Sequence, residues 1–420
     1  MHAPLRQFHG DSLVTAKETL SSADIESIRA RAHLLQKSKN FEAAAQAWRQ
    51  IIERHPEDAE AMNELGSVFS NTGRFEEGLH WIRRALEIRP DLISAKANAG
   101  VALRHLSRFE EAVSSFKDVI ASTPDDAIAC FNLGVSLHSL QRQEEALKWL
   151  QRASDLWPDH GDSAHELGNV LQKLKRNEEA ISAYRRAISL KPDCIAALLS
   201  LGGLLQEARQ FEEASATFQK VVDIDPNHCN GWLSLGAALL GTRRHAESLA
   251  AFRRALAIQP GSVVAYCNMS LALMGLERFE EAIDACRKAL FIEPGSPVAT
   301  FNLGCVLLTL GNFREGWEAY EYRYAIHGKK WLCEEAHAAP WTGETLQGKS
   351  IVILGEQGNG DQIQFARYLP ELSDLGASVS YLVPARLHRL FGTLRGSINL
   401  LSEIAQNSRF DFQCPLMSLP

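Results

Sequence analysis

Eight prolines recur every 34 residues along this chain of 420 residues. They are Pro56, Pro90, Pro124, Pro158, Pro192, Pro226, Pro260 and Pro294. Glycine follows the same interval, with a serine at one place: Gly66, Gly100, Gly134, Gly168, Gly202, Gly236, Ser270 and Gly304. A fixed interval of about 20 to 50 residues is the signature of a repeat architecture. We therefore predict that most of the chain is a stack of similar units.

Counting back from each proline divides the chain into units that follow a short N-terminal extension, residues 1–24. The units are 25–58, 59–92, 93–126, 127–160, 161–194, 195–228, 229–262 and 263–296. A ninth unit, 297–330, carries Gly304 but has Gly328 where the proline would stand. The repeated part thus spans residues 25–330.

Each unit reads as two helices. In the fifth unit, "SAHELGNVLQKL" has apolar residues at helical spacing, and "EEAISAYRRAISLKP" follows after a short break. Acidic residues in the first turn of this second helix suit the helix dipole. Pro192 ends the second helix, because the residue before a proline disfavours helical geometry. Gly168, Ala180 and Ala187 are small, so the two helices can approach closely. Such a pair buries its apolar face only by stacking on its neighbours.

This pattern resembles the tetratricopeptide repeat (TPR), a 34-residue helix pair with small residues at these offsets and a closing proline. The resemblance covers residues 25–330. It implies a mostly α fold, a right-handed superhelix whose concave groove is lined by the first helix of each pair. It also implies a protein or peptide as the partner.

One position on the first helices carries a polar residue in successive repeats, at intervals of 34 residues: Asn98, Asn132, Glu166, Ser200, Ser234, Asn268 and Asn302. The row is similar to the asparagine ladder of O-GlcNAc transferase, which holds the backbone of an extended peptide. An Asn amide both donates and accepts hydrogen bonds, so such a row suits any peptide backbone. The alternative is that these side chains bond a neighbouring helix, and both readings stay open.

The repeat pattern stops after Gly328, and a different fold is expected beyond it. Residues 331–349 read as a connection. "SIVILG", "ASVSYLVP", "INLLS" and "FDFQCPLMSLP" then read as strands that alternate with helical segments. This alternation predicts a parallel sheet, a partial Rossmann-like α/β domain over residues 350–420. In the first helical segment we expect Ile363, Ala366, Leu369 and Leu372 on one face and a kink at Pro370.

A glycine loop, Gly355-x-x-Gly358-x-Gly360, joins the first of these strands to its helix. It matches neither the dinucleotide fingerprint nor the phosphate-binding P-loop, and a tight turn alone could explain it. The segment resembles bacterial proteins that join TPRs to a glycosyltransferase-like domain. It is more distantly similar to the first half of ADP-heptose heptosyltransferases, which have two Rossmann-like halves (the GT-B arrangement).

That resemblance implies roles for individual residues of the loop. Asp361 would be the general base, Gly358 and Gly360 would let the backbone approach a ligand, and Gln364 could contact the acceptor. Arg367 would fix the loop or the sheet. Asp361 could instead be an ordinary helix N-cap.

In such transferases the nucleotide-sugar donor binds mainly to the second half, which would lie beyond Pro420. We therefore expect a protein-interaction scaffold with a glycosyltransferase-like part that is inactive as it stands and holds no cofactor. The alternative is a fragment of a TPR-containing glycosyltransferase that acts on a protein or an envelope glycan. Nucleotide-sugar would then bind only if the second half is supplied.

Composition narrows the partners further. The formal net charge is -7 and the basic residues are spread along the chain, which disfavours nucleic acid. No stretch approaches the ~20 apolar residues that a membrane helix needs. The eight cysteines are scattered without metal-ligand spacing, so we expect no metal site and a reducing cytoplasm.

Overall fold

The computed structural model describes residues 22–327, 333–356, 358–405 and 408–419. The N-terminal extension up to residue 21 and the predicted end of the ninth unit, including Gly328, lie outside the described residues. The described chain separates into two compact units, one ending at Leu204 and one beginning at Leu205, and each is described by itself.

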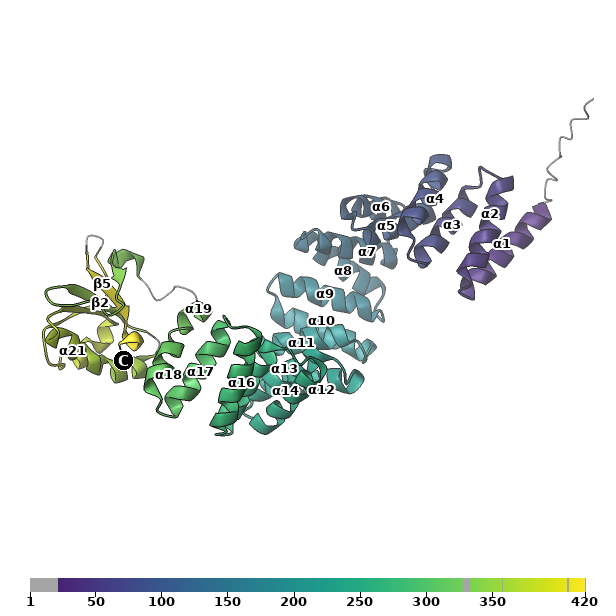
Figure 1. Ribbon diagram of the computed structural model, residues 1–420. Coiled ribbons are helices and arrows are strands. Elements are labelled where there is room, and N and C mark those ends of the chain that lie inside the picture. The colour runs from purple at the N-terminus through teal and green to yellow at the C-terminus, as the bar shows by residue number, and fades with distance from the viewer. Residues whose placement is uncertain (1–21, 328–332, 357, 406–407, 420) are drawn as a thin grey trace, which may run out of the picture. The chain divides into compact units, whose positions relative to one another are not determined.

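The first unit consists of antiparallel helix pairs in the order predicted (Figure 1). Its helices are α1 (Ser22–Lys37), α2 (Phe41–Arg54), α3 (Ala59–Asn71), α4 (Phe75–Ile88), α5 (Ile93–His105), α6 (Phe109–Ser122), α7 (Ala127–Ser139), α8 (Gln143–Leu156), α9 (Gly161–Lys173) and α10 (Asn177–Leu190). Helix α11 (Ile195–Glu207) runs across the division between the units. The first helices of successive pairs contact one another and form an inner layer.

The second unit continues the pattern and then changes to α/β structure. Its helices are α12 (Phe211–Ile224), α13 (Cys229–Gly241), α14 (His245–Ile258), α15 (Val263–Gly275), α16 (Phe279–Ile292), α17 (Pro297–Thr309), α18 (Phe313–Tyr320), α19 (Arg323–His327), α20 (Asn359–Phe365), α21 (Leu369–Asp374) and α22 (His388–Phe391). Its strands are β1 (Ala339–Pro340), β2 (Ser350–Leu354), β3 (Ser378–Leu382), β4 (Ile398–Leu401) and β5 (Phe412–Pro415).

The small residues lie where the two helices of a pair meet, as predicted. A Cβ added to Gly168 would fall 2.6 Å from Cε1 of Tyr184, a buried side chain of α10. In the second repeat, a Cβ on Gly66 would fall 2.7 Å from the carbonyl oxygen of Gly78. These contacts are closer than van der Waals separation, so the helix spacing depends on glycine.

Two further features of the turns recur every 34 residues. The residue that ends each turn between paired helices has a left-handed backbone, at Lys39, Gly73, Ser107, Gln141, Lys175, Arg209, Arg243, Glu277 and Gly311. An arginine just before the second helix pairs with a glutamate in its first turn in many repeats, as in Arg74–Glu77 and Arg278–Glu281. These ion pairs are exposed, so each adds little stability.

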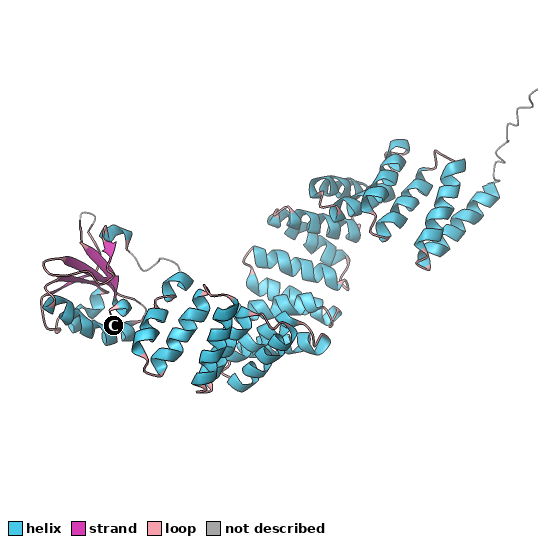
Figure 2. Ribbon diagram, viewed as in Figure 1, coloured by secondary structure: helices cyan, strands magenta, loops and turns pink. Residues whose placement is uncertain are grey.

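The strands form one parallel sheet with the order β1-β5-β2-β3-β4 (Figure 2, magenta). The four strands predicted from the sequence are β2 to β5, and the predicted connection 331–349 supplies β1 at the edge. Ile351 and Ile353 of β2 lie in the core that also contains Leu369 and Leu372 of α21, whereas Val352 packs with Ala336 on the other face. The sheet is therefore buried on both faces.

The helical segment after the glycine loop differs from the prediction in two details. Its interruption is a 3₁₀ turn at Ala366–Tyr368, and Pro370 lies in the first turn of α21, where its missing N–H costs nothing. The expected apolar face was wrong at Ile363, whose side chain is 50% exposed. The buried face of α20 is formed by Gln362 and Phe365 instead, which lie at helical spacing with the buried Ala366 and Leu369.

Candidate functional site

The predicted polar row lies on the first helices, from α5 to α17, as expected. Three of its asparagines use their amides inside the solenoid. Asn98 Nδ2 donates to Asn63 Oδ1 at 3.0 Å, and Asn132 Nδ2 donates to the carbonyl oxygen of Ile128 at 2.9 Å. Asn302 Nδ2 donates to the carbonyl oxygen of Cys267 in the preceding repeat at 3.0 Å. Hydrogen bonds between neighbouring repeats thus account for two of these amides.

The remaining members of the row, Glu166, Ser200, Ser234 and Asn268, are half-buried. Glu166 Oε1 lies 3.8 Å from His165 Nδ1. Burial lowers the pKa of Arg104, and the negative charge of Glu166 partly opposes this shift. Neighbouring Tyr184 donates to Asn169 Oδ1 at 2.8 Å, and burial raises its pKa to about 12. The inner face of the first unit is thus polar at this point.

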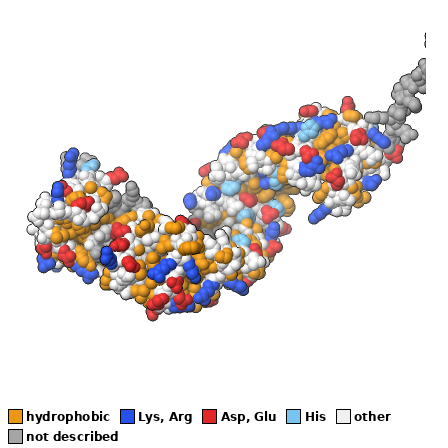
Figure 3. Space-filling model, in the orientation of Figure 1, with side chains coloured by type: hydrophobic (Ala, Val, Ile, Leu, Met, Phe, Trp, Pro, Cys, Tyr) orange, Lys and Arg blue, Asp and Glu red, His pale blue; other side chains and the backbone are white. Residues whose placement is uncertain are grey.

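The inner helices of the second unit also present exposed apolar side chains, as Ile128, which is 57% exposed, does on α7 of the first unit. Val264 and Val298 occupy the same place in successive repeats and are 59% and 43% exposed, and Leu271 of α15 is 39% exposed. Figure 3 shows hydrophobic side chains, in orange, around α16 and α17. Helices α15 and α17 contact each other directly, and we call their three exposed side chains Val264, Leu271 and Val298 the apolar strip.

The glycine loop leads into the short helix α20, with Gly358 as the residue that precedes its first turn. Asp361 lies inside that turn, so the alternative reading of Asp361 as the N-cap is wrong. Among the described residues, no atom lies within 4 Å of a Cβ added to Gly360. Gln364 and Arg367 are exposed. Gln362 is the buried amide of this helix, and Tyr381 donates to its Oε1 at 3.4 Å.

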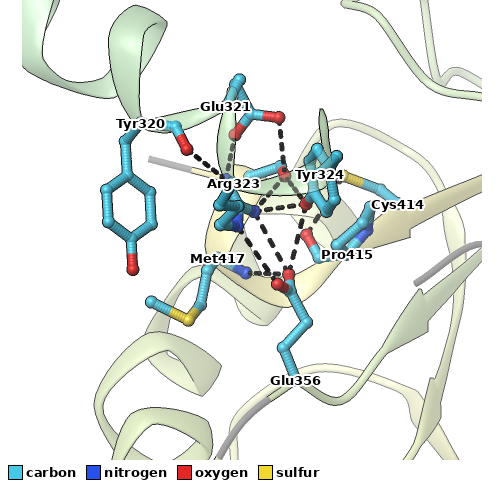
Figure 4. Close-up of polar contacts among 9 residues, drawn as sticks. Tyr320, Glu321, Arg323, Tyr324, Glu356, Cys414, Pro415 and Met417 are labelled. Carbon is cyan, nitrogen blue, oxygen red and sulfur yellow. Dashed lines mark hydrogen bonds and ion pairs between the residues drawn. The ribbon is translucent and has the colours of Figure 1, made fainter. Parts of the chain in front are cut away.

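A buried polar cluster, which the sequence did not reveal, lies where the carboxyl ends of β2 and β5 meet (Figure 4). Glu356 follows β2, is 1% exposed, and accepts from the backbone N–H of Met417, just after β5, at 3.1 Å. Arg323 of α19 is 2% exposed and contacts both carboxylate oxygens of Glu356 at 3.3 Å. The end of the repeats and the sheet therefore share a buried ion pair.

Several neighbours complete this cluster. Arg323 also donates to Glu321 Oε1 at 2.6 Å and to Ser418 Oγ at 2.7 Å, and it contacts the hydroxyl of Tyr324. Burial acts to lower the pKa of Arg323, but the hydrogen bonds to Glu356 and Glu321 outweigh it and the pKa is raised. Burial raises the pKa of Tyr324 strongly. The cluster is thus a cation held by two carboxylates, with the hydroxyls in their neutral form.

The class of protein that this fold defines is a solenoid of stacked helix pairs. Residues 29–93, 125–193, 171–239 and 263–295 match family models of the tetratricopeptide repeat. The chain is therefore a tetratricopeptide repeat protein.

Among curated proteins, the chain is 38% identical over 79 residues to Protein FlbA of Caulobacter vibrioides. The match spans 18% of this chain and 13% of FlbA, so the chain covers a small part of that relative's length.

Solved TPR structures are similar over less than half of the chain. YrrB, described as a TPR protein with an unusual peptide-binding site, is 24% identical with a TM-score of 0.42, over 44% of this chain and 96% of its own. PilF of Pseudomonas aeruginosa is 22% identical with a TM-score of 0.44, over 49% of this chain and 94% of its own. MamA of Desulfovibrio magneticus is 19% identical with a TM-score of 0.39, over 42% and 99%.

Among the residues that the structure describes, no helix is long and apolar enough to cross a membrane.

All eight cysteines are free thiols, and burial raises the pKa of Cys267 and Cys305 to about 11 and of Cys414 to about 12. Thiols with such raised pKa values are poor nucleophiles at neutral pH.

Proposed function

We propose that this protein is an interaction scaffold whose first helices bind a peptide or protein segment. The observation that carries the proposal is the exposed apolar strip of Val264, Leu271 and Val298 on the inner helices α15 and α17. Ser234 and Asn268, half-buried members of the polar row, lie on α13 and α15 of the same unit and would bind the peptide backbone. Apolar anchors beside backbone-binding polar groups are the usual chemistry of peptide recognition.

The test is a selection of random 12-residue peptides displayed on phage against the full chain, followed by titration of the enriched peptides. We expect Leu271→Glu and Val298→Glu to weaken their binding at least tenfold, because a carboxylate then occupies the apolar strip. The matched control is Lys220→Glu, an exposed substitution on the second helix α12, which should bind as the unsubstituted chain does. Enrichment of no peptide, or equal binding by all three variants, would exclude the scaffold function.

A second proposal concerns the α/β part. We propose that it is the Rossmann-like first half of a glycosyltransferase. Taken from β4, the order β4-β3-β2-β5 has the chain order 3-2-1-4 of a Rossmann fold, and ligands of such sheets bind where this order reverses. The glycine loop and Asp361 follow β2 at that point. In the described structure Arg323, Glu356 and Ser418 occupy part of this crevice.

This second proposal predicts sugar transfer only when a donor-binding half is supplied. The experiment joins or adds such a half and measures transfer from a nucleotide-sugar to protein acceptors. Asp361→Asn should abolish transfer because the base is lost, whereas the exposed Asp374→Asn should leave it unchanged. Undiminished transfer by Asp361→Asn would remove Asp361 from the chemistry.

A further inference from the structure

Phe313, the aromatic residue that begins the second helix of the last repeat, is more exposed than the corresponding phenylalanines of earlier repeats. In the second repeat the corresponding Phe75 stacks on His105, the last residue of the next first helix, with ring centroids 4.4 Å apart. In the sixth, the ring of Phe211 lies against Gly241 at the end of α13. Among the described residues, which leave out 328–332, no helix end covers Phe313, and its side chain is 62% exposed, whereas Phe75 and Phe211 are half-buried.

Phe313 forms one wall of an aromatic notch of about 840 Å³. Trp317 of α18 forms the base, and Phe365 and Tyr368 line the side contributed by the α/β part. The Trp317 and Phe365 rings meet edge to face with centroids 5.7 Å apart, so the base of the notch is fixed. This volume lies within the range of pockets that take a ligand or a side-chain anchor, roughly 300 to 1,000 Å³.

Two arginines flank this apolar base. Arg314 and Arg367 line the notch and are exposed, and neither has a carboxylate partner among the described residues. Arg367 is oriented by Tyr368, whose hydroxyl accepts from its Nη2 at 3.3 Å. Glu318 is the one acidic side chain among the lining residues. Aromatic and arginine side chains are the types enriched at protein interfaces, and arginine favours carboxylates.

We propose that this aromatic notch binds a short acidic amphipathic helix of a partner protein. In the second and sixth repeats the end of a helix covers the equivalent ring, so a helix is the shape that fits over Phe313. Its apolar side chains would pack on Phe313 and Trp317, and its carboxylates would pair with Arg314 and Arg367. This site lies on the end of the last repeat and does not depend on peptide binding along the first helices.

The probe is a fluorescein-labelled 16-residue peptide of Glu, Leu and Ala with leucines four residues apart, titrated with the full chain by fluorescence anisotropy. We expect saturable binding that weakens when salt is raised. A peptide with Gln in place of every Glu should bind at least tenfold more weakly, because the charge-assisted contacts are lost.

Matched substitutions locate the binding. Phe313→Ala and the double variant Arg314→Ala/Arg367→Ala should each weaken binding at least tenfold. The controls are Phe291→Ala, which removes an aromatic ring that is 89% exposed on α16, and Arg287→Ala on the same helix. Absence of saturable binding, or equal losses in the control variants, would overturn the proposal. Competition by oligothymidine at the peptide's own affinity would also overturn it and indicate a nucleic-acid site.

Discussion

Gly66 and Gly203 both lie inside first helices, yet their surroundings are opposite. A Cβ on Gly66 would meet the carbonyl oxygen of Gly78 at 2.7 Å, whereas nothing lies within 4 Å of a Cβ on Gly203. Alanine is favoured over glycine in a helix interior by roughly 0.5 to 1 kcal/mol. We therefore expect Gly203→Ala to stabilise the protein. Gly66→Ala should destabilise it by about 1 to 3 kcal/mol, because the helices are forced apart. Urea unfolding followed by circular dichroism measures both, and equal effects would contradict the contact argument.

At the same scale, the glycines and prolines of the repeats could be predicted because each has one dominant structural reason. The left-handed residue at each turn could not. Ser107, Gln141, Lys175 and Glu277 share this backbone with Gly73 but no side-chain chemistry. The two helices that the turn connects impose the left-handed backbone at this position, so the type of residue does not predict it. The pair Arg74–Glu77 recurs at the 34-residue interval and could have been found by comparing the units.

At the scale of elements, the start of β2 is joined to the segment before β5 by one carboxylate. Asp411 accepts from the backbone N–H of Ser350 at 2.8 Å, from its hydroxyl at 2.9 Å and from Lys349 Nζ at 3.2 Å. The two bonds from Ser350 and the one from Lys349 lower the pKa of Asp411 from 3.8 to about 2. The ionised form is thus favoured in the folded state.

This lowered pKa predicts a pH-dependent contribution to stability. It is fully present above about pH 5, where the carboxylate is ionised in both states, and is lost as the pH falls through 3.8 toward 2. Asp411→Asn should therefore be less stable than the unsubstituted protein at pH 7, and the difference should shrink between pH 5 and pH 2. Urea midpoints at pH 7, 4 and 3 measure this. Asp374→Asn, which removes an exposed ion pair with Arg395, is the control. A difference that stays constant with pH would contradict the assignment.

Strands β2 and β3 were predictable because short β-branched runs between turn residues have few other readings. Strand β1 was not, because it has two residues and one of them is Pro340. It exists because Ala339 and Pro340 lie in parallel register with Phe412 and Gln413. Strand β1 therefore forms because β5 lies beside it, and a pattern in the local sequence cannot predict that pairing.

At the scale of the whole molecule, the transition from repeats to sheet depends on contacts between distant parts of the sequence. The row of polar residues and the glycine loop were visible as patterns. Arg323 and Glu356 were not, because they are 33 residues apart and Glu356 occupies a variable position of the glycine loop, where the pattern assigns it no role. Only the meeting of α19 with the ends of β2 and β5 makes them partners.

This buried pair gives the last prediction. Arg323→Met leaves the Glu356 carboxylate buried without its cation and should cost about 3 to 5 kcal/mol. Glu356→Gln leaves Arg323 with Glu321 as its remaining carboxylate partner and should cost less. The double variant removes both charges while the Gln oxygen can still accept from Met417, so much of the loss should be recovered. Hydrogen exchange should show reduced protection of α17–α19 and β2–β5 in the single variants. Helices α3–α8 should be unchanged, because repeats contact only their neighbours.

The control is Arg278→Ala, which breaks the exposed pair with Glu281. Single variants as mild as this control, or a double variant that is destabilised by the sum of the two, would show that the pair does not join the repeats to the sheet.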